Sequence, residues 1–238
     1  MKRLYLSDLH LEASNAPQFE RWTELMADAV ERVDEIVILG DLVEMWIGDD
    51  DPGEDAAALR ACLSQTTQTT PVSLLPGNRD FLFGNAFAEQ TGVHLLEDPS
   101  LTTDGIMLAH GDALCTDDAE YQQVRSLLRS PAWQQDILGK SIEERQALGA
   151  MMRAQSRSAN ANKAANIMDV NQQEVETLLS KSPAQVLIHG HTHRPGIHHY
   201  QNGKRIVLGS WERCAWICWQ TDSVFELECF SLARRYGT

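Results

Sequence analysis

The sequence predicts an α/β sandwich, and three features of the chain carry this prediction. Short apolar runs that end in a polar turn recur along its length. Between the first of these runs, apolar residues recur at helical spacing, and this alternation is typical of strands that alternate with helices. An antiparallel hairpin pattern appears near the end. The 238 residues, 43% hydrophobic and 23% charged, fit one large globular domain or two small ones.

Five apolar runs are expected to form buried strands that each end in a loop. They cover residues 4–6, 36–39, 72–75, 106–109 and 186–188. Apolar residues from Phe19 to Val33 recur at helical spacing after a start near Pro17, which predicts a first helix. A further helix is predicted from Phe81 to Thr91, and Gly92 ends it.

The last part of the chain changes to an antiparallel pattern. Residues 198–200 and 205–208 flank Asn202-Gly203, a dipeptide that strongly favours a two-residue hairpin turn. A second pair of strands is expected between residues 216 and 230. We therefore expect the sandwich to finish in antiparallel strands.

Residues 121–181 contain no strand-like run but several helix starts, including the capping box from Ser141 to Glu144. We predict a core formed by residues 1–120 and 182–238, with 121–181 as a helical insertion. Residues 125–163 carry seven positive and three negative side chains. Either an anionic ligand binds this segment or the charges belong to a solvated helical face.

The overall charge and the cysteines exclude several classes of function. Lys and Arg number 20 against 34 Asp and Glu, a net charge of −14, so we expect no nucleic-acid partner. The apolar runs are too short to span a membrane, and the first residues turn polar too soon for a secretory signal, so we expect a chain that is not exported. Five cysteines without a CxxC pair favour a reducing cytoplasmic compartment. No obligate protein partner is inferred.

Five of the predicted strand ends carry side chains that bind metals. These candidate ligands are Asp8, His10, Asp41, Asn78, His110, His191 and His193. The carboxyl ends of adjacent strands meet at one edge of an open α/β sheet, so the ligands should converge there. Each one alone has an ordinary explanation as a loop cap or a hydrogen-bonded core histidine. Crowded together, they would be costly without a cation.

Mixed imidazole and carboxylate donors suit Mn, Fe, Zn or Co better than Ca. A pair of such ions about 4 Å apart is a common device for phosphoryl transfer. The set of ligands therefore predicts a two-metal hydrolase.

The same residues resemble, in order, the five sequence motifs of the calcineurin-like metallophosphoesterases. The motifs are Asp8-Leu9-His10, Gly40-Asp41, Gly77-Asn78-Arg79-Asp80, His110-Gly111 and Gly190-His191-Thr192-His193. This resemblance implies a four-layer α/β/β/α sandwich in which residues 121–181 form a lid. It implies one metal held by Asp8, His10, Asp41 and His193, and a second held by Asp41, Asn78, His110 and His191. The catalytic residues that it implies are Asp41, Asn78, Arg79 and His110.

Arg79 departs from the motif of most of this superfamily, which has a histidine there. A histidine would donate a proton to the leaving oxygen, whereas arginine stays protonated and acts as a fixed cation. The Arg79 motif and the segments 44–51, 110–118 and 167–171 together resemble a narrower family, the UDP-2,3-diacylglucosamine pyrophosphatases of lipid A biosynthesis. A sugar phosphate leaving group needs little proton donation, which is compatible with arginine.

The narrower resemblance implies hydrolysis of UDP-2,3-diacylglucosamine to UMP and 2,3-diacylglucosamine 1-phosphate (lipid X) by water activated by two Mn²⁺ ions. It also implies peripheral attachment to the cytoplasmic face of the inner membrane. The positions that it implies for substrate contact are Asn78, Arg79, Asp118, Ser156, Asn160, Lys163 and His191.

Other interpretations stay open on the residues themselves. The apolar residues of the insertion either line a chamber for acyl chains, lie on a bilayer surface or form an ordinary helical core; they are Trp133, Ile137, Leu138, Ile142, Leu148, Met151 and Met152. The acidic run 49–51 is interpreted as a solvated loop. The alternatives for function are a soluble metallophosphoesterase acting on nucleotides or phosphoproteins, and a non-catalytic scaffold of the same fold.

Overall fold

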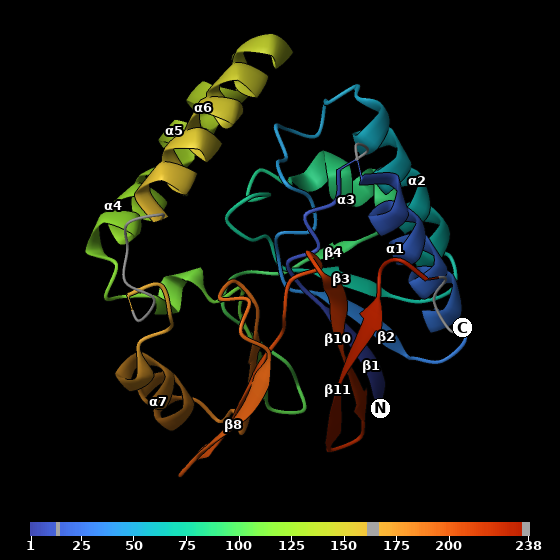
Figure 1. Ribbon diagram of the computed structural model, residues 1–238, viewed down its shortest axis with the longest axis vertical. Coiled ribbons are helices and arrows are strands. Elements are labelled where there is room, and N and C mark those ends of the chain that lie inside the picture. Colours follow the sequence, from blue (N-terminus) through green and yellow to red (C-terminus); the bar gives the residue numbers. More distant parts are fainter. Residues whose placement is uncertain (13–14, 161–166, 235–238) are drawn as a thin grey trace.

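The computed structural model describes residues 1–12, 15–160 and 167–234, and these form two β-sheets with helices outside them (Figure 1). The first sheet has the strand order β11 (Val224–Ser231), β10 (Cys214–Thr221), β1 (Lys2–Leu6), β2 (Glu35–Ile38), β3 (Val72–Leu74) and β4 (His94–Leu95). The second has the order β5 (Ser100–Leu101), β6 (Ile106–Leu108), β7 (Val186–His189), β9 (Gly203–Val207) and β8 (Gly196–Tyr200).

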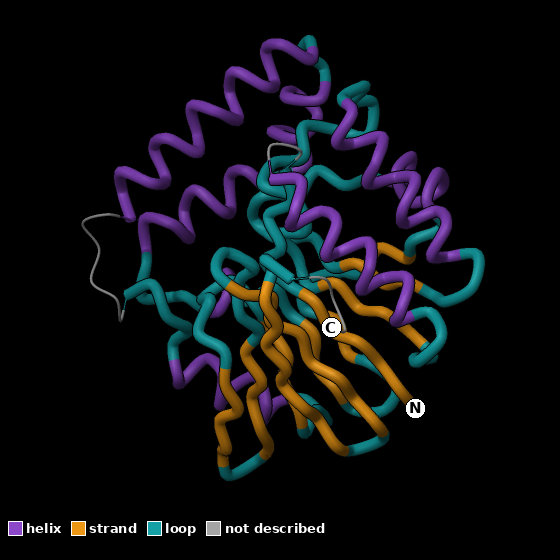
Figure 2. Tube along the Cα trace, turned by 45° about the vertical axis from the view of Figure 1, so that its right-hand side comes forward, coloured by secondary structure: helices purple, strands orange, loops and turns teal. Residues whose placement is uncertain are grey.

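The described helices fall into two groups around these sheets. The core helices are α1 (Ala16–Ala29), α2 (Glu54–Thr67), α3 (Asn85–Thr91) and α7 (Gln172–Lys181). The other helices are α4 (Ala119–Leu128), α5 (Pro131–Leu138) and α6 (Ile142–Asn160), which we call the helical module. Figure 1 shows the module on the side of the molecule away from α1 and α2. Figure 2 shows it above the strands.

Alternate residues of the central strands face different cores, which explains why these strands are almost entirely apolar. In β1, Leu4 and Leu6 pack against residues of α1, α2 and α3, whereas Tyr5 lies between the two sheets. In β7, Ile188 lies between the sheets and Leu187 packs against α7. The cores therefore stack as helix, sheet, sheet and helix, and the four-layer sandwich is confirmed.

The element predictions hold with three differences. The predicted first helix corresponds to α1, and the predicted hairpin and final strand pair are β8–β9 and β10–β11. The helix predicted from Phe81 is wrong at its start, because Phe83 N–H donates to the Asp80 carbonyl in a turn and α3 begins only after Gly84.

Two further differences concern α2 and α7. The apolar pattern of the sequence does not predict α2, because its buried face is narrow and consists of Ala56, Leu59, Leu63 and Thr66. α7 lies within the predicted insertion 121–181 but packs on the outer face of the second sheet through Val175 and Leu179. The part of the insertion that stands apart from the sandwich is the helical module.

Arg3 anchors the end of the sandwich opposite the strand-end loops, and it makes stability depend on pH. Its buried guanidinium lies 2.7 Å from a carboxylate oxygen of Asp104 and 2.7 Å from one of Glu35. Burial alone would raise the pKa of Asp104, but the hydrogen bond from Arg3 prevails and lowers it to about 2.

The pKa of an unfolded aspartate is about 3.9, so the Asp104 pair stabilises the fold above about pH 4 and loses this effect as the pH falls toward 2. We expect Asp104→Asn to flatten the decline of the urea midpoint between about pH 4 and pH 2. Urea unfolding of both proteins, followed by circular dichroism at several pH values, measures how the midpoint depends on pH. Equal slopes for wild type and variant would contradict the assignment.

Candidate metal centre

The seven predicted ligands lie in loops that directly follow strands, and the fold brings all of them to one end of the sandwich. Asp8 and His10 follow β1, while Asp41, Asn78 and His110 follow β2, β3 and β6. His191 and His193 follow β7. We call these seven residues the donor cluster. Their convergence follows from the parallel pairing of β1, β2 and β3 and of β6 with β7.

The backbone of the donor cluster is held in an unusual conformation. Five of its residues have left-handed φ angles between 49° and 62°, namely Asp8, His10, Asp41, His191 and His193. This conformation is costly for residues with a side chain and gathers at functional sites. Backbone hydrogen bonds from Asp8 to Gly40 (3.1 Å) and from His10 to Asp41 (2.9 Å) fasten the first two loops together. The surrounding fold therefore imposes the geometry of these ligands.

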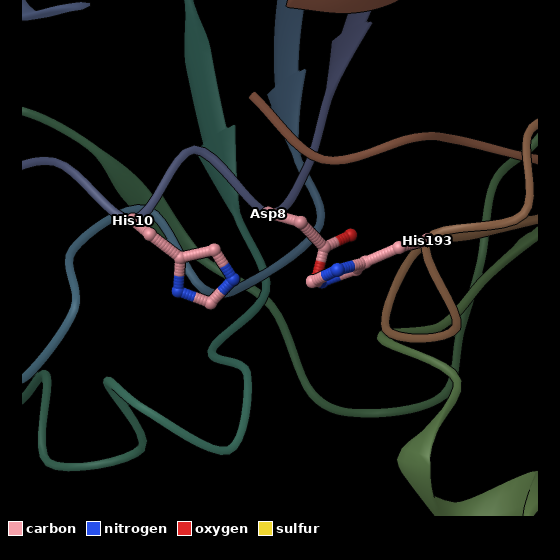
Figure 3. Close-up of side chains that lie close together, drawn as sticks. All are labelled: Asp8, His10 and His193. Carbon is pink, nitrogen blue, oxygen red and sulfur yellow. The ribbon is translucent and has the colours of Figure 1, made fainter. Parts of the chain in front are cut away.

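The first group of donors consists of Asp8, His10, Asp41 and His193. Nε2 of His193 lies 3.3 Å from Oδ1 of Asp8, and the rings of His10 and His193 are 5.5 Å apart (Figure 3). Nε2 of His10 is buried without a hydrogen-bond partner, 3.8 Å from Oδ2 of Asp41. A buried ring nitrogen aimed at carboxylates fits a divalent cation.

The second group of donors meets at the side-chain oxygen of Asn78. This Oδ1 lies 2.9 Å from Nε2 of His110 and 2.8 Å from Nδ1 of His191. Oδ1 of Asp41 lies 3.6 Å from Nε2 of His110, so the Asp41 carboxylate faces both groups. Nδ1 of His110 is 2.9 Å from the carbonyl oxygen of Leu39, and donation to that carbonyl leaves Nε2 free to bind a metal.

The electrostatic environment of His10 and His110 favours positive charge. Burial alone would lower the pKa of His110, but the carboxylates of Asp41 and Asp112 outweigh it and raise this pKa to about 9. Burial would also lower the pKa of His10, which the Glu44 hydrogen bond and the charge of Asp41 raise to about 9. The potential that holds protons on these rings also attracts a divalent cation.

Two buried or half-buried carboxylates that support the cluster received no role from the sequence. Oε2 of Glu44 lies 2.8 Å from Nδ1 of His10. Asp80 accepts hydrogen bonds from the backbone of Gly77 (2.6 Å) and Leu42 (2.7 Å), and so joins the loops that carry Asn78 and Asp41. Asp80 follows Arg79 directly in its motif, but spacing along the chain does not indicate which amides it meets.

The prediction of a solvated loop at 49–51 holds only in part, because Asp50 is 64% exposed but Asp49 and Asp50 both bind groups elsewhere in the fold. Asp49 accepts hydrogen bonds from the backbone of Gly84 (3.1 Å) and Phe87 (2.9 Å), at the start of α3. The carboxylate oxygens of Asp50 lie 2.7 and 2.6 Å from the guanidinium of Arg145 in α6. These two acidic side chains fix a helix start and the position of the module.

The positive charge of the insertion is largely paired with the core, which neither interpretation of the sequence anticipated. Arg125 contacts Asp112 at 2.9 Å and Arg129 donates to the carbonyl of Gly77 at 2.9 Å. Arg145 binds Asp50, and Arg153 binds Glu12 and Glu44; both arginines are in α6. These arginines fasten the module beside the donor cluster.

A cavity of about 310 Å³ lies between the donor-cluster loops and the module. Asn78, Arg79 and Ser156 line it, as the sequence expects of substrate contacts. Among the apolar residues singled out in the insertion, Trp133, Ile137, Leu148 and Met152 line the cavity. Leu138 and Met151 are exposed instead.

Among the other predicted substrate contacts, Asp118 and His191 do not line the cavity. Asp118 is the N-cap of α4 and accepts a hydrogen bond from the backbone of Tyr121 at 3.1 Å. Asn160 ends α6, but its side chain is outside the described part of the chain, and so is Lys163.

Gly40 is required where the loops after β2 and β3 approach each other. Its φ is 83°, and a Cβ atom there would lie 2.6 Å from the backbone nitrogen of Gly77 and 2.6 Å from Nδ1 of His110. We expect Gly40→Ala to lower the free energy of unfolding by at least about 1–2 kcal/mol, because a left-handed conformation costs that much for a residue with Cβ.

Urea denaturation measures this cost, and Gly139→Ala is the matched control. Gly139 has φ of −77°, and the nearest atom to an added Cβ is 3.4 Å away, so we expect no loss of stability. Equal stability of the two variants would show that the loops do not need this close approach.

Comparison with known proteins identifies the family of this chain. The sequence profile of the calcineurin-like phosphoesterase family matches residues 1–195. A curated protein from Serratia proteamaculans, named UDP-2,3-diacylglucosamine hydrolase, is 43% identical over 89% of this chain and 91% of its own length. A protein of the same name from Chromohalobacter salexigens is 41% identical over 89% of each chain.

Solved structures with low sequence identity share the fold. A dimetal phosphatase from Danio rerio superposes with a TM-score of 0.54 at 14% identity, covering 98% of this chain and 96% of its own. A novel archaeal phosphodiesterase gives a TM-score of 0.51 at 13% identity, covering 97% and 100%. The chain therefore belongs to the calcineurin-like phosphoesterase family and, within it, to the group whose curated members are named UDP-2,3-diacylglucosamine hydrolase.

Proposed function

We propose that this chain hydrolyses the pyrophosphate bond of UDP-2,3-diacylglucosamine to UMP and 2,3-diacylglucosamine 1-phosphate, as part of lipid A biosynthesis. The observation that carries the proposal is the position of the cavity, which runs from the donor-cluster loops to apolar side chains of the module. A diphosphate placed at Asn78 and Arg79 would leave its acyl chains beside Trp133 and Met152. The names of the curated relatives support this substrate.

The proposed cofactors are two Mn²⁺ ions. The first group, Asp8, His10, Asp41 and His193, would hold one, and Asp41, Asn78, His110 and His191 would hold the other. When bound, such ions lower the pKa of water toward neutrality and neutralise charge on phosphoryl oxygens. The orphaned Nε2 of His10 and the oxygen of Asn78 facing two imidazoles are what support this assignment.

Arg79 supplies a fixed positive charge to the reaction. Its side chain lines the cavity, and its Nε is buried without a hydrogen-bond partner. Its backbone N–H donates to Oδ1 of Asp41 at 2.8 Å, which places the residue directly beside the donor cluster. We assign to the guanidinium the binding of phosphoryl oxygens as their charge grows, while the sugar phosphate leaves without a proton donor.

The proposed insertion, 121–181, contributes its helical module as the lid over the substrate. Ser156 on α6 lines the cavity and supplies a hydroxyl. We propose further substrate contacts from Asp118, Asn160, Lys163 and His191.

The proposed location is the cytoplasmic face of the inner membrane, with reversible attachment. Within the described residues, no helix combines the length and hydrophobicity needed to cross a bilayer. The module exposes large apolar side chains, namely Val124, Leu127, Leu138 and Met151. Contact of these side chains with the lipid surface would place the cavity next to a membrane-bound substrate.

The test is release of UMP from UDP-2,3-diacylglucosamine by the purified protein with Mn²⁺. A water-soluble phosphodiester and a nucleotide are offered in parallel. We expect turnover of the lipid substrate to exceed that of both soluble compounds by several orders of magnitude. Faster hydrolysis of a soluble compound would support a general metallophosphoesterase, and no turnover of any compound would support the scaffold alternative.

A further inference from the structure

Glu44 contacts a donor-cluster histidine and the helical module at the same time. Oε2 of its carboxylate lies 2.8 Å from Nδ1 of His10, on the side of the ring away from Asp41. Oε1 forms an ion pair with the guanidinium of Arg153 in α6. The side chains of His10, Glu44 and Arg153 are 16, 17 and 25% exposed, so the chain of contacts is largely screened from water.

The contact between Glu44 and His10 determines which ring nitrogen of His10 is available to bind a metal. A neutral imidazole has one N–H and one lone pair. Donation of the Nδ1 proton to Glu44, 2.8 Å away, leaves the lone pair on Nε2, which is buried and faces Asp41. Carboxylates that hold the second nitrogen of a metal-binding histidine fix both its tautomer and its ring orientation.

The second contact fixes the carboxylate itself. With only His10 as a partner, Glu44 would be free to change rotamer, and the ring would lose its support. Arg153 restricts that freedom, and Arg153 in turn is within 3.3 Å of Glu12. The orientation of His10 therefore depends on where α6 lies.

We propose that Glu44 is a positioning residue that couples the seating of helix α6, meaning its docked position against the core, to metal binding by His10. The coupling acts through Arg153. The inference rests on the proposed two-metal site. A seated α6 favours the binding of the ion held by His10. By thermodynamic reciprocity, binding of that ion favours the seated position of α6. Helix α6 and the metal centre then respond to each other through Arg153 and Glu44.

Arg145 provides a matched comparison on the same helix. It also joins α6 to the core, but through Asp50 and the carbonyl oxygen of Ile47, and neither of these residues belongs to the donor cluster. Loss of Arg145 removes one link between α6 and the core and leaves Arg153, Glu44 and His10 in contact. This variant separates a general loss of docking from the specific coupling.

The first experiment titrates the purified wild type, Glu44→Gln, Arg153→Met and Arg145→Met with Mn²⁺ and follows the free ion by electron paramagnetic resonance. We expect Glu44→Gln to weaken one of the two ions roughly 10- to 100-fold, the usual effect of losing such a support. Arg153→Met should weaken the same ion by a smaller factor, and Arg145→Met should match wild type. Circular dichroism verifies that each variant is folded.

The second experiment follows amide hydrogen exchange of residues 142–159 with and without Mn²⁺. We expect Mn²⁺ to slow exchange in wild type and in Arg145→Met, and to have no effect on exchange in Glu44→Gln and Arg153→Met. Wild-type affinity or a wild-type exchange response in Glu44→Gln or Arg153→Met overturns the coupling alone. A wild type that binds no Mn²⁺ overturns the proposed function together with it.

Discussion

Asp41→Asn is expected to reduce the rate of pyrophosphate hydrolysis about 1,000-fold, the largest loss that we predict. The two oxygens of Asp41 face Nε2 of His10 at 3.8 Å and Nε2 of His110 at 3.6 Å, so its charge serves both donor groups. Lewis acidity from bound ions is worth several kcal/mol, and about 4 kcal/mol corresponds to three orders of magnitude in rate. A neutral amide at this position would hold the two proposed ions less tightly than a carboxylate does.

The fold should survive this substitution. The asparagine oxygen can still accept the hydrogen bond from the backbone of Arg79, which is 2.8 Å long in the native chain. Removal of the charge also relieves repulsion of Asp80, whose pKa is raised to about 6 by burial and by Asp41. We therefore expect an unfolding midpoint at or above that of the metal-free wild type.

Initial rates at saturating Mn²⁺, together with the number of ions bound per chain, measure the effect of Asp41→Asn. Asp28→Asn is the control, because Asp28 lies on the exposed face of α1 and pairs only across the surface with Arg32. A rate within tenfold of wild type for Asp41→Asn, with two ions still bound, would remove the bridging role.

Arg79→Ala is expected to lower kcat by about 100- to 1,000-fold, the usual cost of losing one donor to developing charge in a transition state. The metal content should stay at the wild-type level, because the Arg79 side chain is not a member of the donor cluster. Its backbone hydrogen bond to Asp41 is retained in the alanine variant. A fall in kcat with unchanged Mn²⁺ binding distinguishes this variant from Asp41→Asn.

Arg79→Lys keeps the charge but loses the planar fork that binds two phosphoryl oxygens, so we expect an intermediate rate. Arg32→Ala, at an exposed position in the turn after α1, is the charge-matched control. Steady-state kinetics with UDP-2,3-diacylglucosamine give kcat and KM separately for each variant. If Arg79→Ala changed KM alone, the guanidinium would bind the ground state and transition state equally, and it would have no catalytic role.

Local pattern and spacing determined much of the architecture and the composition of the donor cluster. Apolar runs followed by a polar turn identified β1, β2, β3, β6 and β7, because strands buried on both faces must be apolar throughout. The same turns carry the seven donors, and parallel strands bring their loops to one edge. The spacing of apolar residues did not predict α2, whose buried face is narrow. It wrongly predicted helix for residues 81–84, where a turn that includes Asp80 and Phe83 replaces the helix.

The partners of the charged side chains follow from how whole elements pack, which local sequence patterns do not show. From the sequence, Arg125, Arg129, Arg145 and Arg153 were an excess of positive charge, and Asp49 and Asp50 were a loop exposed to water. In the fold, each contacts a group far away along the chain, such as Asp50 and Arg145, which are 95 residues apart. A periodic pattern reports which face of an element is buried, whereas ion pairs depend on how whole elements pack. For that reason the donors were visible in the sequence, but the contact from His10 through Glu44 to α6 was not.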